Sequence, residues 1–316
     1  MRLADQPFVQ RLAESGPVLL AGMGGGFDVY TAVPFYLALR SLGAEVHLAN
    51  FAFTALEGVS GRRLTPEHVV VEGPVGAWLR YFPERELSLW LSERVGERVP
   101  VHTFEGCGVA PLRAAYDALT AELAIETLVL VDGGTDALMR GDEVGLATPE
   151  EDATSLAAVH GLARPMRRYV VCVGFGIDTF HGVSHAHFLE NTAAFQREGA
   201  FLGAFSLLPG MPEADAYVAL VDAVHERHRH SIVNGSVASA IDGAFGDVHR
   251  TNRTRPSELF INPLMSMAWA YDLGAVARRN LYLETLEGTE RLVEVSARIE
   301  AFRKGRTLRE PRALPM

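Results

Sequence analysis

The first motif with chemical potential is a glycine-rich turn that follows an apolar segment near the start of the chain. It comprises Gly24, Gly25, Gly26, Phe27 and Asp28. Glycine lets a backbone turn tightly and approach a ligand, and the helix expected next offers free N–H groups. We therefore predict that residues 24–27 contact a ligand. A carboxylate would repel a bare phosphate and would instead suit a metal ion, a hydroxyl or an amine. We predict that Asp28 binds a metal ion, with a helix N-cap as the structural alternative.

This turn does not match either of two well-known nucleotide-binding motifs. Phe27 stands where the dinucleotide fingerprint needs its third glycine, and no Gly-Lys-Ser/Thr follows for a P-loop. The ligand therefore stays open at this point.

A second motif places two aspartates at the end of a continuously apolar segment. It reads Asp132, Gly133, Gly134, Thr135 and Asp136. Carboxylates within about one turn of each other either share a proton or hold a cation. We predict that Asp132 and Asp136 bind a metal and that residues 133–135 contact the ligand. An Asx turn closing on its own backbone is the alternative.

A third motif brings several polar residues together after another apolar segment. It contains Gly176, Asp178, His181, His185 and His187. Helix starts lower histidine pKa values and so favour the neutral imidazole that base catalysis needs. We predict one of the three histidines as general base and Gly176 and Asp178 as ligand contacts. The spacing matches no standard zinc motif.

Three weaker features complete the set of candidates. Asn262 follows an apolar segment and is a candidate ligand contact, although turn chemistry also explains Asn-Pro. In Thr148-Pro149-Glu150-Glu151-Asp152, Thr148 and Glu151 are explained by a capping box at a helix start, and Glu150 and Asp152 by the helix dipole, so these acids are not assigned to catalysis. Cys107, in a Gly-rich turn, fits a buried inert thiol better than a nucleophile.

The elements that must position these residues alternate between strands and helices. Expected strands are 17–22, 45–53, 68–72, 99–104, 127–131, 169–174 and 201–207, with an eighth at 258–261; expected helices are 29–42, 74–91, 111–123, 149–162, 185–198, 212–229 and 283–302. Continuously apolar strands imply burial on both faces, as in a parallel sheet covered by helices. The prediction is a single α/β domain over 1–316 with a doubly wound, Rossmann-like, mostly parallel sheet and helices on both faces. Residues 230–257 are expected to form a lid or a helical insertion.

Composition narrows the classes of function. The chain has 316 residues and a formal net charge of −10, which argues against a nucleic-acid partner. Two cysteines fit a reduced compartment, and neither a signal peptide nor a membrane span is evident. We expect a cytoplasmic protein with a small-molecule substrate, and a homo-oligomer remains open.

The loops described above resemble those of an uncharacterised prokaryotic family, the domain of unknown function 1152. Gly24 to Asp28, Asp132 to Asp136, and Gly141-Asp142-Glu143 with Thr148 to Asp152 carry the resemblance, which extends over most of the chain. It implies a Rossmann-like α/β fold and marks these loops, but it implies no reaction.

The leading hypothesis is a metal-dependent hydrolase that acts on a small polar or phosphorylated metabolite, such as a nucleotide or nucleoside. Oxygen ligands favour Mg²⁺, Ca²⁺ or Mn²⁺ over zinc, and a metal with a base activates water. One alternative is a group-transfer enzyme that uses a nucleotide or NAD. The other is a non-catalytic ligand-binding or regulatory module.

Overall fold

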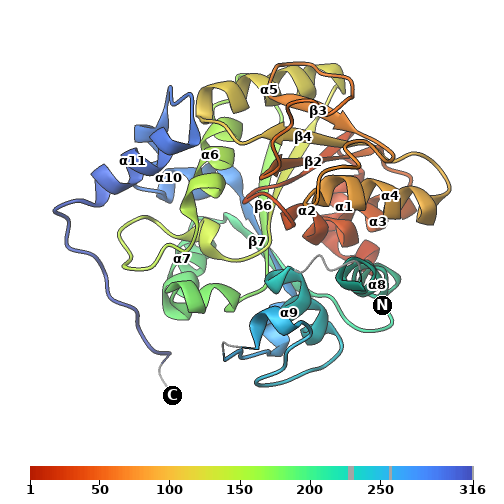
Figure 1. Cartoon of the computed structure of the whole chain (residues 1–316). Coiled ribbons are helices and arrows are strands. Elements are labelled where there is room, and N and C mark those ends of the chain that lie inside the picture. The colour runs from red at the N-terminus through yellow and green to blue at the C-terminus, as the bar shows by residue number, and fades with distance from the viewer. Residues whose placement is uncertain (227–230, 256–257, 315–316) are drawn as a thin grey trace.

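A computed structural model describes residues 1–226, 231–255 and 258–314, apart from the side chain of Arg253. The strands form one mixed sheet in the order β3-β4-β2-β1-β5-β6-β8-β7 (Figure 1). Their bounds are β1 Val18–Gly22, β2 Val46–Ala52, β3 His68–Val71, β4 Val101–Glu105, β5 Thr127–Asp132, β6 Arg167–Val173, β7 Phe201–Ser206 and β8 Met267–Asp272. The helices are α1 Pro7–Ala13, α2 Asp28–Thr31, α3 Val33–Ser41, α4 Pro83–Val95, α5 Val109–Glu122, α6 Pro149–His160, α7 His185–Arg197, α8 Pro212–Glu226, α9 Ile232–Ile241, α10 Leu273–Arg279 and α11 Leu292–Arg303.

The centre of the sheet is parallel and its outer strands are not. Strands β4, β2, β1, β5 and β6 run in one direction, with Val18 of β1 in register with Val46 on one side and Thr127 on the other. Strands β3 and β8 run antiparallel to their neighbours β4 and β6, and β7 runs antiparallel to β8. The α/β class and the mostly parallel sheet are confirmed, whereas the antiparallel strands were not foreseen.

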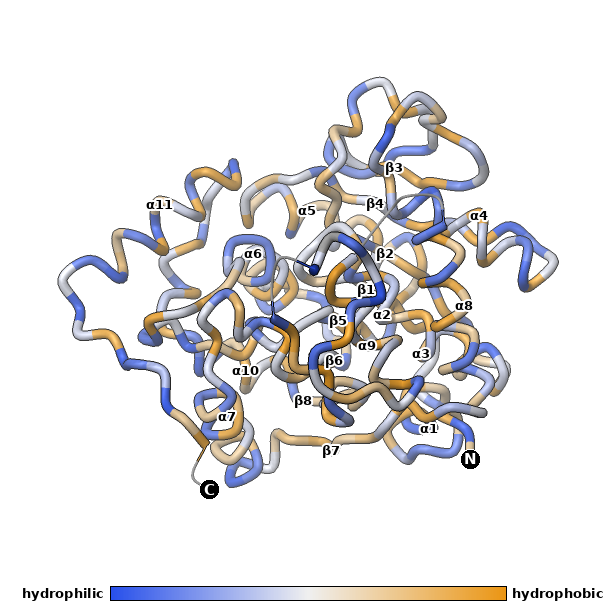
Figure 2. Tube along the Cα trace, turned by 60° about the horizontal axis from the view of Figure 1, so that its bottom comes forward, coloured by the Kyte–Doolittle hydropathy of each residue, from blue (hydrophilic) through white to orange (hydrophobic). Residues whose placement is uncertain are grey.

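Alternate residues of the central strands supply two separate hydrophobic cores. Leu19 and Leu128 pack into one core with residues of α5, α6, α7, α10 and α11. Leu20 and Val129 pack into the other with residues of α1, α2, α3, α4, α8 and α9. Successive side chains of a strand point to opposite faces, so strands β1 and β5 are buried on both. They lie at the centre of the molecule, together with β6 (Figure 2).

The chain connections reverse direction beside β1. From β1 the chain passes to β2 on one side, and after β4 it returns to β5 on the other side of β1. The loops that leave β1 and β5 therefore emerge side by side at the carboxyl ends of the strands. This is where open α/β sheets bind their ligands.

Several expected helices differ from those in the structure for local reasons. The segment expected as one helix over 29–42 is two helices, because Pro34 near the start of α3 cannot donate a backbone hydrogen bond. The helix expected over 283–302 is interrupted at Gly288, which has a φ of +73°. Similarly, α4 begins only at Pro83, because Gly76 in the preceding segment has a φ of +59°.

The eighth strand was placed wrongly. Residues 258–261 form an isolated bridge between Gly246 and Ile261 and no strand, while Met267–Asp272 is the strand β8. Two of the six residues of β8 are alanine, a poor strand former, and its stability comes from pairing with β6 and β7 on either side.

The segment 230–257 contains helix α9, whose residues 234–241 are all buried. Residues 230, 256 and 257 lie outside the described part of the chain, so the expectation of a lid or insertion stays a prediction. None of the helices in the described ranges combines the length and apolar character that crossing a bilayer requires.

Candidate functional site

Three aspartates from three different elements meet at the carboxyl ends of β1 and β5. Asp28 begins α2 after the glycine turn, Asp132 ends β5, and Asp152 lies in the first turn of α6. Each offers one carboxylate oxygen, and these oxygens all lie within 4.8 Å of one another. Among the described residues no other group of His, Cys, Asp or Glu comes together in this way, and no histidine joins this one.

Two glycines make this approach sterically feasible. A Cβ atom on Gly24 would lie 2.6 Å from Asp152 Oδ1 and 2.7 Å from Asp28 Oδ2. A Cβ atom on Gly133 would lie 2.8 Å from Asp28 Oδ1. The Gly24 N–H donates to Asp28 Oδ2 over 2.7 Å, so the glycine turn holds the carboxylate in place. The glycines are needed because backbone and carboxylates are in direct contact.

Asp136 and Asp178 extend the group on the far side of Gly134. A Cβ atom on Gly134 would lie 2.9 Å from Asp178 Oδ2 and 3.0 Å from Asp136 Oδ1. The Thr135 N–H donates to Asp178 Oδ2 over 2.7 Å, and the Thr148 N–H donates to Asp136 Oδ2 over 3.2 Å. We call Asp28, Asp132, Asp136, Asp152 and Asp178 the acid cluster.

Burial and mutual repulsion raise the pKa values throughout the acid cluster. Burial is the largest cause at every member, and it raises the pKa of Asp28 to about 7 and that of Asp178 to about 6. The pKa values of Asp132, Asp136 and Asp152 lie well above the ordinary range because neighbouring carboxylates add to the effect of burial. Without a counter-charge, the cluster therefore retains protons near neutral pH.

Two carboxylate oxygens of the cluster have no partner in the described part of the chain. Asp132 Oδ2 and Asp152 Oδ1 are buried and accept no hydrogen bond from the described residues, and the two side chains are only 2% and 4% exposed. No described arginine, lysine or histidine pairs with any of the five aspartates. Buried carboxylate oxygens normally have partners, and here either a retained proton or a bound cation would supply one. Asp28, Asp132 and Asp152 could hold a hard cation through oxygen atoms.

From the sequence, Asp152 was assigned to the dipole at a helix start; it does lie in the first turn of α6, but its side chain also joins the acid cluster. Thr148 is the N-cap residue of α6, but its side chain makes no capping hydrogen bond and lies 3.5 Å from Asp136 Oδ2. The capping-box explanation was therefore wrong, although Pro149 does start the helix. The available signal was the spacing of Asp152 and Ser155 on one helix face; the Ser155 hydroxyl donates to Met23 O over 2.7 Å.

The contacts of the predicted histidines are with residues outside the acid cluster. His181 is exposed and packs on Phe180, while His185 is half-buried with its ring 5.0 Å from that of Phe175. Burial lowers the pKa of His185. The His185 ring lies against Gly176, whose φ is +87°, at a point where any side chain on residue 176 would collide with the ring.

His187 faces the C-terminal segment. Its side chain is buried, and burial lowers its pKa, as does the nearby Arg309. The charge of Glu143 acts in the opposite direction and raises the pKa of His187. Neither Glu143 nor Arg309 belongs to the acid cluster. The groups that act on the pKa of His187 thus belong to the C-terminal segment and to the loop at Glu143.

Asn262 and Glu143 serve local structure. The Asn262 carboxamide oxygen accepts from Leu264 N–H, and its Nδ2 donates to Phe260 O, so turn chemistry uses both ends of the side chain. Glu143 is 1% exposed and accepts from Gly141 N–H and from Arg309, which ties the C-terminal segment to this loop.

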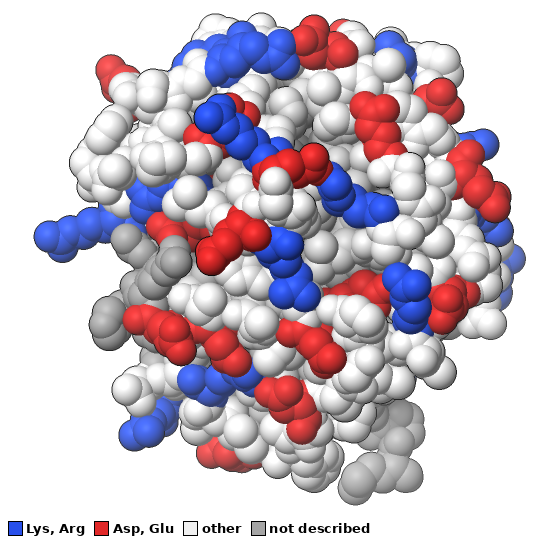
Figure 3. Space-filling model, turned by 90° about the vertical axis from the view of Figure 1, so that its right-hand side faces the viewer, with Lys and Arg blue, Asp and Glu red and all other residues white. Residues whose placement is uncertain are grey.

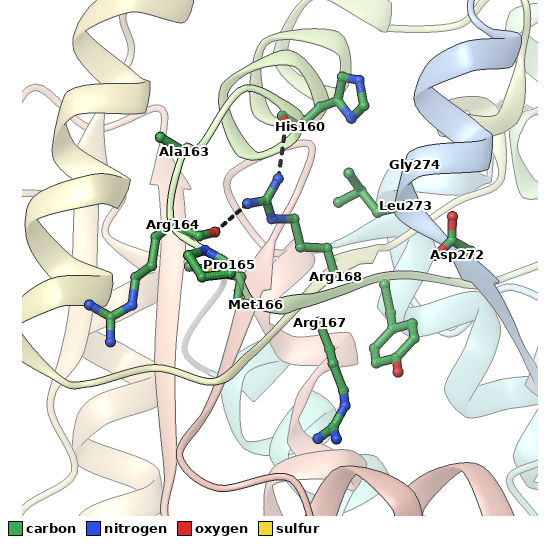
Figure 4. A pocket seen from close by; sticks show the side chains of 11 residues that line it. His160, Ala163, Arg164, Pro165, Met166, Arg167, Arg168, Asp272, Leu273 and Gly274 are labelled. Atoms are coloured by element: carbon green, nitrogen blue, oxygen red, sulfur yellow. Dashed lines mark hydrogen bonds between the residues drawn. The ribbon is translucent and has the colours of Figure 1, made fainter.

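A large hollow elsewhere on the protein lacks convergent chemistry. It measures about 430 Å³ and lies at the amino-terminal end of β6, at the opposite edge of the sheet. Arg168 there donates to the carbonyl groups of His160 and Arg164, and the side chains of Arg164, Arg167 and Arg168 point in different directions (Figure 4). These arginines therefore do not converge on a shared ligand position.

A smaller hollow of about 250 Å³ adjoins His185. Thr179, Phe180 and Phe260 are among the residues that line it.

On the face shown in Figure 3, Lys and Arg side chains are interspersed with Asp and Glu, and no continuous basic patch forms among the described residues.

Fold and site together define an α/β protein with a buried carboxylate site at the carboxyl ends of its central parallel strands. The family model described as "Protein of unknown function (DUF1152)" matches residues 95–305, which is more than half of the chain. The chain belongs to this family, as the resemblance of its loops indicated. A search of curated proteins finds no match.

Proposed function

We propose that the protein is a metal-dependent hydrolase of a small polar or phosphorylated metabolite, with Asp28, Asp132 and Asp152 as metal ligands. The observation that carries this proposal is that Asp132 and Asp152 each keep a buried, unpartnered oxygen, and that both belong to the three aspartates whose ligand oxygens lie within 4.8 Å of one another. A cation there would supply the missing counter-charge and lower the pKa values that burial now raises.

The donor set favours a hard divalent cation. All three ligands are carboxylate oxygens, which suit Mg²⁺, Mn²⁺ or Ca²⁺, whereas zinc prefers nitrogen and sulfur. Both cysteines are buried, and burial raises the pKa of Cys107 to about 12, so a thiolate ligand is not at hand. A hard cation held by Asp28, Asp132 and Asp152 would offset the charge of a phosphate group and would make a nearby water molecule more acidic.

The position in the sheet supports a small ligand at the same place. We propose that the sheet is Rossmann-like, because its parallel strands β4-β2-β1-β5-β6 reverse their connection between β1 and β5. The turn at Gly24 to Gly26 and the turn at Gly133 to Gly134 flank this point. A metal on the cluster would offset the repulsion that Asp28 would otherwise exert on a phosphate.

The general base that we propose is Glu151 instead of a histidine. Glu151 adjoins Asp152 in the first turn of α6, and its charge raises the pKa values of both Asp28 and Asp152. Its own pKa is raised to about 7, with burial as the largest cause. The position of Glu151 beside Asp152 supports this role, since a carboxylate can take a proton from a nearby water molecule.

The test is a titration of the metal-stripped protein with Mn²⁺ and with Mg²⁺, followed by thermal unfolding and calorimetry. We expect metal to raise the unfolding temperature of the wild type, because ligands that bind the folded state stabilise it. Asp132→Asn should fold and should lose this rise. Asp117→Asn, at an exposed position of α5, should keep it.

A panel of phosphorylated metabolites and nucleosides then tests hydrolysis in the presence of the metal that binds. We expect turnover in the wild type, and a loss of at least about 100-fold in kcat for Glu151→Gln with metal binding retained. Absence of metal-dependent stabilisation in the wild type would overturn the proposed function. Metal binding without turnover on any substrate class would favour a ligand-binding module.

A further inference from the structure

Two aromatic side chains lie exposed against the glycine turn of the candidate site. Phe53, which follows β2, is 55% exposed, and Tyr81, which precedes α4, is 37% exposed. A Cβ atom on Gly25 would lie 3.1 Å from the Phe53 ring, and one on Gly26 would lie 2.9 Å from it. The same atom on Gly26 would lie 2.6 Å from the Tyr81 hydroxyl. We call Phe53 and Tyr81 the aromatic platform.

We infer that the aromatic platform is a base-binding subsite and that the ligand is a nucleoside phosphate, with its base stacked on Phe53. This inference rests on the proposed function, because the phosphate end is placed at the acid cluster. The exposed face of a large aromatic ring offers an apolar surface to a ligand. Any of the nucleic-acid bases can stack on such a surface, because every base has a flat aromatic face.

The backbone of the glycine turn fixes the plane of the Phe53 ring. Gly25 and Gly26 have φ values of +88° and +58°, and their missing side chains leave the space that the ring occupies. The Gly26 N–H donates to Phe51 O over 3.1 Å, which joins the turn to the strand that leads to Phe53. The ring is therefore backed by a rigid surface on one side, while the rest of it remains open.

The same turn connects the platform to the acid cluster. Gly24 contacts Asp28 and Asp152, whereas Gly26, two residues later, contacts Phe53. Two residues of chain span at most about 7 Å, a length that a ribose phosphate can bridge. A ligand with its phosphate at the cluster can thus bring its base to Phe53 without leaving the surface of the turn.

A ligand without an aromatic base would not cover the exposed ring of Phe53. A sugar phosphate satisfies the cluster and the glycine turn, but it offers no flat apolar ring to cover Phe53. The comparison between a nucleotide and the matching sugar phosphate therefore isolates the platform from the rest of the site.

The experiment measures equilibrium binding of AMP, ribose 5-phosphate and adenosine to the full chain with and without Mn²⁺. The variants are Phe53→Leu, which keeps an apolar cover but removes the ring, and Phe53→Trp, which keeps a stacking surface. Phe245→Leu is the matched control, since Phe245 is a similarly exposed phenylalanine on another segment, at 69%.

We expect Phe53→Leu to weaken AMP binding by about tenfold and to leave ribose 5-phosphate unchanged. Phe53→Trp and Phe245→Leu should bind AMP as the wild type does. Equal effects of Phe53→Leu on both phosphates, or no effect on either, would overturn the inference. If Mn²⁺ binds but AMP shows no preference over ribose 5-phosphate, the platform fails and the metal site stands. If Mn²⁺ does not bind while adenosine binding still depends on Phe53, the proposed function fails and the platform stands.

Discussion

The side-chain amide of Asn50 donates a hydrogen bond to the carboxyl group of Glu84 over 2.6 Å, in the interior beneath the glycine turn. The same amide donates to Gly26 O over 2.8 Å, so this contact links α4 to the turn. Glu84 is fully buried, and burial raises its pKa to about 7. Its second oxygen, Oε2, and the amide oxygen of Asn50 are both buried without a partner among the described residues. A proton on Glu84 would supply the donor that these two acceptors lack.

Substitution of Glu84 tests whether this proton supports the glycine turn. The folded protein keeps the proton between about pH 4.5 and pH 7, where unfolded Glu84 has released it, so the free energy of unfolding falls as pH rises through this window. Glu84→Gln, which carries its own donor, should lose less stability than the wild type between pH 5 and pH 8. Urea unfolding at both pH values measures the difference.

Glu84→Ala provides the companion measurement. It leaves the Asn50 amide without its carboxyl partner and should cost about 1–3 kcal/mol at pH 5. If the wild type and Glu84→Gln lose the same stability with pH, the carboxyl group is ionised in the folded protein and the assignment is wrong.

Metal binding should depend steeply on pH because metal and protons compete for the same oxygens. The pKa of Asp28 is raised to about 7 and that of Asp178 to about 6, so the metal-free folded protein binds more protons than the unfolded chain over roughly pH 4 to 7. Its stability should therefore fall as pH rises through this window, while affinity for Mn²⁺ rises by about tenfold per pH unit for each proton displaced. Calorimetry at pH 5.5, 6.5 and 7.5 measures this, and an affinity that does not change with pH would contradict it.

Asp152→Asn tests whether Asp152 is a metal ligand or only an acid that stabilises the start of helix α6. Removal of this buried carboxyl group should stabilise the metal-free protein at pH 7 by about 1 kcal/mol, since burial and the charges of Asp136, Asp132 and Asp28 raise its pKa well above the ordinary range. It should also lower Mn²⁺ affinity by at least about 100-fold. Glu150→Gln, in the same helical turn but outside the acid cluster, should change neither quantity. Destabilisation of both variants by similar amounts would show that the acids act only on the helix dipole.

Cys107 should be unreactive in the folded protein. Its side chain is 7% exposed, and burial raises its pKa to about 12, so the thiolate fraction at neutral pH is very small. A thiol reagent at pH 8 should label neither cysteine in the native state and both after unfolding in urea. If mass spectrometry locates rapid labelling at Cys107 in the native state, the prediction is wrong and Cys107 becomes a candidate nucleophile.

Much of the fold and part of the site follow from the sequence. The continuously apolar segments around Leu19 and Leu128 predict strands buried on both faces, and the strands there are confirmed. Residues that directly follow parallel strands emerge at one edge of the sheet, so Asp28 and Asp132 could be placed near each other without knowledge of the loops.

Only the tertiary structure decided which further side chains reach that edge. Asp152 and Asp178 join the acid cluster and His187 does not, although all three belong to segments of similar polarity. A helical residue points inward or outward according to how its helix packs on the sheet, and successive residues differ by about 100° in direction. Strand β8 likewise owes its existence to neighbours on both sides, and pairing over such distances leaves little trace in the residues themselves. Local pattern therefore determined the strands and the turns, while long-range packing determined the membership of the site.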